Sequence, residues 1–248
     1  MKSLRIKLTI TILAVFFIAL SALGGLNYWK SRQLLMESMQ ESLMNQTVNS
    51  ADQLGLWIDA RRSEVQIMAN SPAIVNGNFE TVVPYLQAFV KTNNVYETMS
   101  YANLSGAMVD ATGWRGNIAN REYFQQALRG EVALSVPVVS KGSGKLISVI
   151  TVPVKSEGKI IGVLSGVIKI EDIGKRVLAI KVGKTGYAYV VQQDGLIIIH
   201  PDQEVAMKIN AVNDEKAPAE IVAIAQRMVK GESGIVQSAK TDKVVAFA

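Results

Sequence analysis

The sequence contains no cysteine and only one histidine, His200. Without cysteine the chain can form neither disulfides nor thiolate metal sites, a composition that fits an exported bacterial domain. A catalytic triad or a histidine-rich metal site would need His200 together with partners, and no residue spacing supplies them. We therefore expect no enzyme activity, no metal site and no cofactor. His200, next to Pro201, is interpreted as a half-buried turn residue.

A complete nucleotide-binding motif is also missing. Gly183, Lys184 and Thr185 have the order found at the end of a P-loop, but the glycine required five positions earlier is replaced by Leu178. A strand is expected after this segment, where a P-loop is followed by a helix. Phosphate binding of the P-loop kind is therefore excluded.

Excess positive charge is confined to one end of the chain. The net charge is +5, from 26 basic and 21 acidic residues. Four of the basic residues, Lys2, Arg5, Lys7 and Lys30, lie among the first 30 residues, which contain no acid, so the remainder is almost neutral. The basic pI therefore does not indicate a nucleic-acid partner.

A long uncharged run occupies residues 8–29. An apolar helix of roughly 20 residues crosses the hydrocarbon core of a bilayer. Basic residues within 1–7 predict a cytoplasmic amino terminus and an exported remainder. The alternative is a cleaved signal peptide, with a site among the small residues 21–25. The run exceeds the roughly 7–15 apolar residues of a signal peptide, so we expect a retained, single anchor in the inner (cytoplasmic) membrane.

The pattern becomes helical after the apolar run. Apolar residues recur at three- and four-residue steps over 30–71, and no proline occurs before Pro72. Such a helix would be about 60 Å long, more than a domain of this size needs for its own core. We interpret residues 30–75 as a stalk. It could pack against its twin, which predicts a homodimer.

Two similar α+β modules with antiparallel sheets are expected after the stalk, over 76–180 and 181–248. Elements of the first are a helix at 78–91, a hairpin of 96–102 and 107–110, a helix at 121–128 capped by Asn120, strands at 133–140, 146–154 and 159–170, and a helix at 171–180. Elements of the second are a hairpin of 187–192 and 196–200, a helix at 218–230, and strands at 234–238 and 244–247. The two hairpins coincide when Gly106 is set on Gly195. The apolar end at Ala248 suggests that the second module is truncated and that the chain continues.

A candidate pocket lies between residues 96 and 140, where aromatic and basic side chains accumulate beside the hairpin. Arg121, at the start of a helix, could offer its guanidinium to a carboxylate or phosphate, and the free N–H groups of that helix would favour the same anion. Alternatively, Tyr123 and Phe124 anchor the helix to the sheet, and Arg121 pairs with Asp110. The residues alone leave both interpretations open.

Several segments together resemble the double Cache (dCache) sensor domain of bacterial methyl-accepting chemotaxis receptors and some sensor kinases. They are residues 120–128 with Gly130, then 136–141, 152–154, Gly158, 161–164, 182–191, 194–195 and 200–201. The resemblance implies a long helix carrying two PAS-like modules outside the membrane. It further implies that the distal module, 76–180, binds a small ligand, and that the proximal module, 181–248, leads to a second membrane helix and a cytoplasmic signalling domain.

One subfamily of that family binds amino acids through an arginine, a tryptophan two positions later, and an aspartate on a later strand. Arg121 fits the arginine, Tyr123 replaces the tryptophan, and the aspartate position falls near Val167. The expected ligand is therefore an organic anion or another metabolite, and an amino acid is less favoured. The expected ligand-binding residues are Tyr101, Asp110, Trp114, Arg115, Arg121, Tyr123, Phe124, Ser135 and Thr151.

These observations favour the extracytoplasmic sensing region of a transmembrane chemoreceptor that signals by helix displacement. The same region could instead serve a histidine kinase or a diguanylate cyclase. An anchored exported hydrolase and a structural adhesion module are further alternatives, and the absence of a nucleophile–base pair argues against the hydrolase.

Overall fold

Helix α1 (Lys2–Ala69) is the longest element of the computed structural model, which describes residues 2–238 and 243–248. The apolar run and the helical pattern that follows it form one continuous helix, as expected, whereas the stalk bounds of 30–75 stay a prediction. It ends shortly before α2 (Pro72–Val75), a single turn that carries its proline in the first position. This position suits proline because the backbone N–H that proline lacks would have no partner there.

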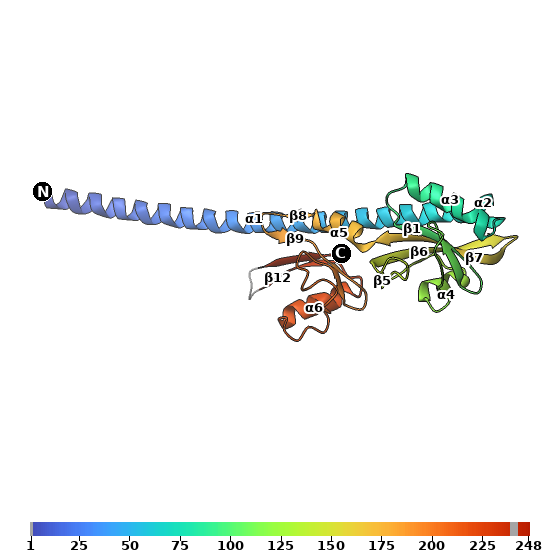
Figure 1. Cartoon of the computed structure of the whole chain (residues 1–248). Helices are drawn as coiled ribbons and strands as arrows, with labels where there is room; N and C mark the ends of the chain where they lie inside the picture. Colours follow the sequence, from blue (N-terminus) through green and yellow to red (C-terminus); the bar gives the residue numbers. More distant parts are fainter. Residues whose placement is uncertain (1, 239–242) are drawn as a thin grey trace. The chain divides into compact units, whose positions relative to one another are not determined.

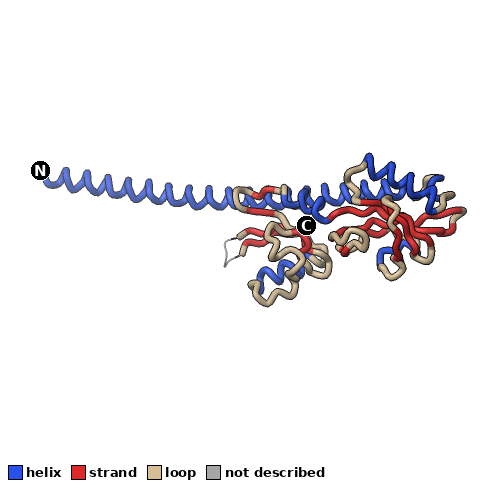
Figure 2. Tube along the Cα trace, viewed as in Figure 1, coloured by secondary structure: helices blue, strands red, loops and turns tan. Residues whose placement is uncertain are grey.

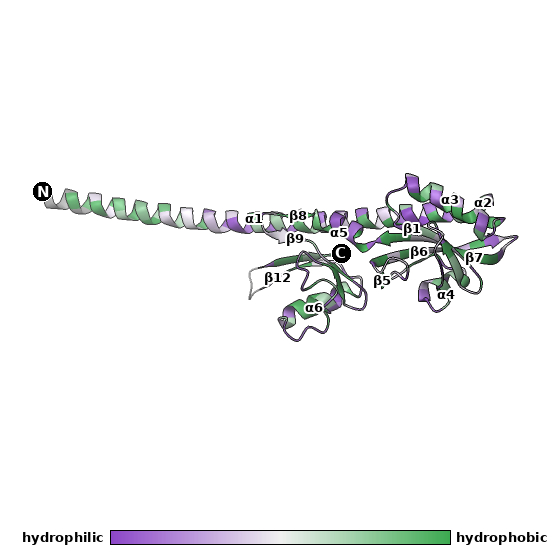
Figure 3. Ribbon diagram, viewed as in Figure 1, coloured by the Kyte–Doolittle hydropathy of each residue, from purple (hydrophilic) through white to green (hydrophobic). Residues whose placement is uncertain are grey.

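The first part of α1 exposes its apolar side chains. From residue 8 to residue 29 the side chains are exposed, and hydrophobic colouring dominates this stretch in Figure 3. The helix is long and apolar enough to cross a membrane. An exposed apolar surface of this size is costly in water and is typical of a membrane span.

Two compact units make up the chain, residues 1–49 with 233–248, and residues 50–232. The first unit combines the amino-terminal part of α1 with a hairpin of β12 (Gly234–Gln237) and β13 (Val244–Phe247). The hairpin is antiparallel, with Gly234 opposite Phe247. Within this unit the side-chain amide of Gln40 donates to that of Gln237 at 3.4 Å.

A seven-stranded antiparallel sheet dominates the second unit (Figure 2). Its strand order is β3-β2-β1-β7-β6-β4, with β5 also paired to β6. The elements are α3 (Phe79–Thr92), β1 (Thr98–Asn103), β2 (Ala107–Asp110), β3 (Arg115–Asn117), α4 (Glu122–Leu128), β4 (Ala133–Leu134), β5 (Val138–Val139), β6 (Leu146–Ser156) and β7 (Lys159–Lys169). The expected α+β class with antiparallel sheets is confirmed.

Helices cover both faces of this sheet. The end of α1 and α3 lie on one side and α4 on the other (Figure 1). The α1 side holds Val65, Leu86, Met99 and Leu164 in one apolar cluster, together with further buried residues. The α4 side holds a second cluster built around Phe124. Since strand side chains alternate between faces, each central strand contributes to both clusters.

The start of α4 differs from the expectation. Arg121, and not Asn120, is the N-cap residue, and it makes no side-chain capping bond. Asn120 therefore does not cap the helix. The amide of Gln125 instead holds the preceding turn by donating to the Ala119 carbonyl at 2.7 Å.

The strand expected at 133–140 is divided into β4 and β5. Pro137 lies between them and cannot donate to the ladder. Ser135 repairs the pairing, because its Oγ accepts from the Val149 backbone N–H at 2.8 Å. Its own N–H donates to the Val149 carbonyl, also at 2.8 Å.

The remainder of the second unit consists of short elements. They are α5 (Ile170–Leu178), β8 (Lys181–Val182), β9 (Gly186–Tyr187), β10 (Val190–Val191), β11 (Ile197–Ile199) and α6 (Ala219–Met228). The strand expected at 187–192 is thus divided as well. Gly106 and Gly195 both have a positive φ, +80° and +92°, at equivalent hairpin turns. The module boundary between 180 and 181 stays a prediction.

Gly166 on β7 allows α1 to approach the sheet closely. A Cβ at this position would lie 2.8 Å from both the Tyr96 ring and the Val65 side chain. We expect Gly166→Ala to lower the free energy of unfolding by about 1–3 kcal/mol through overpacking. The measurement is urea unfolding of the detergent-solubilised chain. Gly55→Ala is the control, because nothing lies within 4 Å of its Cβ and the helix gains about 0.5–1 kcal/mol. Equal midpoints for the two variants would contradict this packing.

Tyr96 joins the sheet to α1 through its hydroxyl, which donates to Glu64 Oε2 at 2.8 Å. Burial, followed by this hydrogen bond, raises the pKa of Tyr96 well above its ordinary value of 10.0. The unfolded chain therefore ionises first, and stability falls as the pH rises above about 10. We expect Tyr96→Phe to flatten this alkaline loss, measured as urea midpoints at several pH values. Parallel curves for the variant and the unchanged chain would show that Tyr96 is not responsible.

Candidate functional site

A cavity lies on the α4 side of the sheet and has a volume of about 60 Å³. One water needs roughly 10–15 Å³ on this scale, so the cavity holds a handful of water-sized groups. Its floor comes from β1, β2, β6 and β7, and its walls from α4 and from the loops beside β3 and β5. The lining residues are Thr98, Ser100, Met108, Asp110, Trp114, Ile118, Arg121, Tyr123, Val138, Val139, Ser140, Lys141, Gly142, Ile147, Val149, Ser165 and Val167.

A row of polar side chains crosses the buried sheet beside this cavity. Asp110 of β2 is opposite Ser100 of β1, which is opposite Ser165 of β7, which is opposite Thr151 of β6. Directly opposed residues of an antiparallel pair lie on the same face with Cβ atoms about 4.5–5.5 Å apart. All four side chains are buried. Such a row is costly in an apolar sheet unless each member has a partner.

Ser165 is a member of this row whose hydroxyl has no partner among the described residues. It is 2% exposed and lines the cavity, and its Oγ makes no hydrogen bond to the residues that the structure describes. A buried hydroxyl left unsatisfied costs about 1–3 kcal/mol. A ligand group in the cavity could satisfy it.

Thr151 ends the row and has a structural partner. It is fully buried, and its Oγ1 donates to the Tyr123 carbonyl at 3.0 Å. This bond fastens the first turn of α4 to β6 and so positions the Tyr123 ring at the cavity. Burial raises the pKa of the Tyr123 hydroxyl, partly offset by nearby Arg121. The phenol therefore stays neutral near pH 7.

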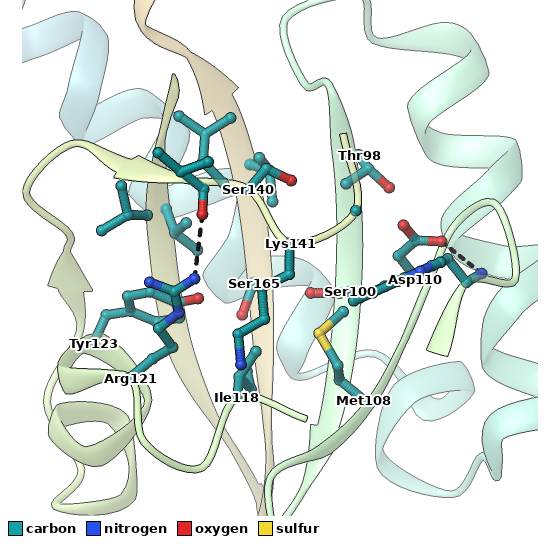
Figure 4. A pocket seen from close by; sticks show the side chains of 17 residues that line it. Thr98, Ser100, Met108, Asp110, Ile118, Arg121, Tyr123, Ser140, Lys141 and Ser165 are labelled. Carbon is teal, nitrogen blue, oxygen red and sulfur yellow. Dashed lines mark hydrogen bonds between the residues drawn. The ribbon is translucent and has the colours of Figure 1, made fainter. Parts of the chain in front are cut away.

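Two cations stand at the mouth of the cavity (Figure 4). The guanidinium Nη2 of Arg121 donates to the Val139 carbonyl at 3.2 Å. The Nζ of Lys141 donates to the Asn117 carbonyl at 2.8 Å. Figure 4 shows the Lys141 side chain between Arg121 and Tyr123 on one side and Met108 and Asp110 on the other. Both cations thus hold neutral acceptors across the opening.

Asp110 is the one carboxylate among the lining residues. Its Oδ1 accepts from the Thr112 N–H at 2.8 Å, the Thr112 hydroxyl at 2.6 Å and the Trp114 N–H at 3.0 Å. It therefore shapes the turn that leads into β3. The alternative in which Arg121 pairs with Asp110 is not what the structure shows, since Arg121 bonds Val139.

Four of the nine expected ligand-binding residues line the cavity, namely Asp110, Trp114, Arg121 and Tyr123. Phe124 does not, because it is 1% exposed and packs in the apolar cluster behind α4.

The remaining four expected residues also lie away from the lining. Tyr101 points to the opposite face, where its ring meets Phe79 edge-on at 6.0 Å. The guanidinium of Arg115 lies 5.7 Å from the same Phe79 ring. The Ser135 hydroxyl accepts from the Val149 N–H between β4 and β5, and the Thr151 hydroxyl donates to the Tyr123 carbonyl of α4. These residues have structural roles in the fold, and their contact with a ligand stays a prediction.

Sequence reasoning missed Lys141, Ser100 and Ser165. A usable signal existed for Ser165, because it is a polar residue at a period-two position within the apolar run of residues 160–168. Nothing in the sequence indicated that Lys141 lines the cavity, since a lysine in a glycine-rich turn is normally solvated. Only the pairing of distant strands brings these three together.

The Asp110 carboxylate should matter for stability. In Asp110→Ala the donors of Thr112 and Trp114 lose their acceptor, and we expect the free energy of unfolding to fall by about 1–3 kcal/mol. Asp110→Asn keeps an oxygen at the same place and should lose less. Urea unfolding compares the three chains. If the alanine and asparagine variants unfold alike, the hydrogen bonds to Oδ1 do not stabilise this turn.

Comparisons with known proteins place this fold. The Cache domain family model dCache_1 matches residues 28–248. The methyl-accepting chemotaxis protein PscA of Pseudomonas syringae pv. tomato is 23% identical over 252 residues, which cover 97% of this chain and 38% of PscA. The chain therefore spans well under half the length of this relative.

Two solved structures share the architecture. One is the ligand-binding domain of the Pseudomonas fluorescens chemoreceptor CtaA in complex with L-isoleucine. Its TM-score is 0.69 at 19% sequence identity, and the match covers 87% of this chain and 87% of the CtaA chain. The extracellular domain of mmHK1S-Z2, described as a histidine kinase, has a TM-score of 0.68 at 15% identity, covering 83% of this chain and 89% of that one. Because the family match extends over most of the sequence, this protein belongs to the Cache domain family.

Proposed function

We propose that this chain is the extracytoplasmic ligand-sensing region of a transmembrane chemoreceptor of the methyl-accepting chemotaxis type. The observation that carries the proposal is the cavity on the α4 side of the sheet, with a buried polar floor and two cations at its mouth. Sites of this kind, apolar with a few convergent polar groups, are typical of small-ligand binding. The relationship to PscA supports the receptor class.

The ligand is proposed to be an organic anion. Arg121 offers a planar fork that suits a carboxylate, and its present acceptor is only a neutral carbonyl. CtaA is seen with L-isoleucine, but an ammonium group needs an acceptor, and Val167 supplies none on this wall of the cavity. Asp110 Oδ1 is already engaged by three donors, so this carboxylate has only its Oδ2 left to accept from an ammonium group. An α-amino acid is therefore less favoured than a plain carboxylate.

Signalling is proposed to proceed by displacement of α1. On β7, Ser165 and Val167 face the cavity, while Gly166 between them touches α1 at Val65. The same strand leads directly into α5, whose Arg176 lies over the Trp57 ring of α1 at 4.7 Å. A ligand that favours one arrangement of β7 would therefore bias α1. The ligand must bind the two arrangements with different affinity, since otherwise no signal is transmitted.

The apolar run of residues 8–29 is proposed to anchor the chain in the inner membrane, with residues 50–232 outside the cytoplasm. Helix shifts of about 1–2 Å are an established switching mode and would suffice along a continuous helix. Exposed apolar residues on the following part of α1, among them Leu34, Leu35 and Met39, support a homodimer formed through this helix.

A second output remains a candidate. The similar fold of mmHK1S-Z2, described as a histidine kinase, favours the sensor region of a kinase, and a diguanylate cyclase belongs to the same alternative. The proposed ligand site is the same for each, so the output is decided by the full receptor. Assays of its methylation, autophosphorylation and cyclic-dinucleotide synthesis would separate the three.

Ligand binding is tested by a thermal-shift screen of the chain in detergent with organic acids, amines, purines and sugars. A ligand at a hundredfold excess over its dissociation constant adds about 2.7 kcal/mol, or about 5–10 °C in melting temperature. We expect an organic acid to give this shift and Arg121→Ala to remove most of it. Arg129→Ala is the matched control, because Arg129 forms an exposed ion pair with Glu131 beyond α4. An equal shift in both variants would place the ligand elsewhere.

A further inference from the structure

The charges at the cavity do not balance. Among the lining residues the cations are Arg121 and Lys141, and the only carboxylate is Asp110. One oxygen of that carboxylate, Oδ1, already accepts three hydrogen bonds from the turn after β2. The lining therefore carries one net positive charge, which favours an anionic ligand, and its two cations offer such a ligand two separate binding points.

The two cations come from separate parts of the fold. Arg121 is the N-cap residue of α4, whereas Lys141 belongs to the turn between β5 and β6. Each reaches a backbone carbonyl, Val139 for the arginine and Asn117 for the lysine. Figure 4 shows the two side chains extending into the same opening from different segments. Two acidic groups on one ligand could thus be held at the same time.

The present acceptor of Lys141 is weak compared with a carboxylate. The Lys141 ammonium already makes a charge-assisted hydrogen bond to Asn117, but the Asn117 carbonyl carries no charge, whereas a ligand carboxylate adds the attraction between opposite charges. Asn117 is an exposed residue, so its carbonyl can bond water when it is released. Exchange of Asn117 for a ligand carboxylate is therefore favourable.

The floor limits the body of such a ligand. Ser165 supplies one unpartnered hydroxyl at 2% exposure, and Val149 and Val167 supply apolar surface beside it. With a cavity of about 60 Å³, only a short aliphatic chain fits between the cations. The unpartnered hydroxyl can donate to a ligand oxygen, and this hydrogen bond would offset the free-energy cost of burying the hydroxyl.

We infer that the cavity takes a short aliphatic dicarboxylate, with one carboxylate bound by Arg121 and the other by Lys141, and with Ser165 donating to a carboxylate oxygen. This inference rests on the proposed ligand-sensing function and names the ligand class. It assigns Lys141 as a binding residue and makes its bond to Asn117 the contact that closes the unliganded site.

The test compares succinate with succinamate, the same four-carbon chain with one carboxylate replaced by an amide. Isothermal titration calorimetry is performed on the 248-residue chain in nanodiscs. We expect succinate to bind at least about tenfold more tightly than succinamate, as removal of one charged hydrogen bond predicts. In Lys141→Met this preference should disappear, because the second carboxylate loses its cation. Malonate and glutarate bracket the chain length.

Lys145→Met is the matched control, since Lys145 is an exposed lysine of the same turn that does not line the cavity. It should keep the preference for succinate. Lys141 is exposed, so its replacement removes no core contact, and Lys141→Gln repeats the test with a polar chain. Succinamate binding as tightly as succinate, or an undiminished preference in Lys141→Met, would overturn the inference.

The inference and the proposed function can fail separately. If no dicarboxylate binds but a monocarboxylate or an amino acid binds and depends on Arg121, the inference is wrong and ligand sensing stands. If neither these probes nor the organic acids, amines, purines and sugars of the wider screen bind, both are wrong.

Discussion

Strands β1 and β7 serve two surfaces at once, because successive side chains of a strand point to opposite faces. Ser100 and Ser165 face the cavity, and Gly166, the next residue of β7, faces α1. The missing side chain of Gly166 leaves no layer between strand and helix. The cavity and α1 are therefore separated by the thickness of one strand. Under the proposed function, a change at the cavity would reach the helix through that strand.

The extent of the elements could be predicted because it depends on local patterns. Period-two alternation located β1, β6 and β7, and glycine-containing turn sequences located the two hairpin turns, whose glycines have a positive φ in the structure. The unbroken helical period located α1. The prediction failed where one residue overrides a pattern over a longer segment. Pro137 has no N–H to donate, so the expected strand became β4 and β5, joined through the Ser135 side chain.

The candidate site was less predictable because it depends on the register between distant strands. Asp110, Ser100, Ser165 and Thr151 form one row only after β2, β1, β7 and β6 are paired. Aromatic and basic residues close in sequence did indicate the region, and three of them, Trp114, Arg121 and Tyr123, reach the cavity. Tyr101 did not, because its position on β1 has the opposite parity to that of Ser100. Parity along each strand separates a cavity residue from a core residue, and residue type alone does not.

Polar groups inside a sheet reduce stability unless they are satisfied, so their presence here requires an explanation. Thr151 and Asp110 have structural partners, and they hold α4 and the turn before β3. The Ser165 hydroxyl has none among the described residues. The unpartnered Ser165 hydroxyl therefore lowers the stability of the fold at the point where β7 lies between the cavity and α1. A ligand that recovers this free energy does so on the strand in contact with the helix, which is where binding must act if it is to shift α1.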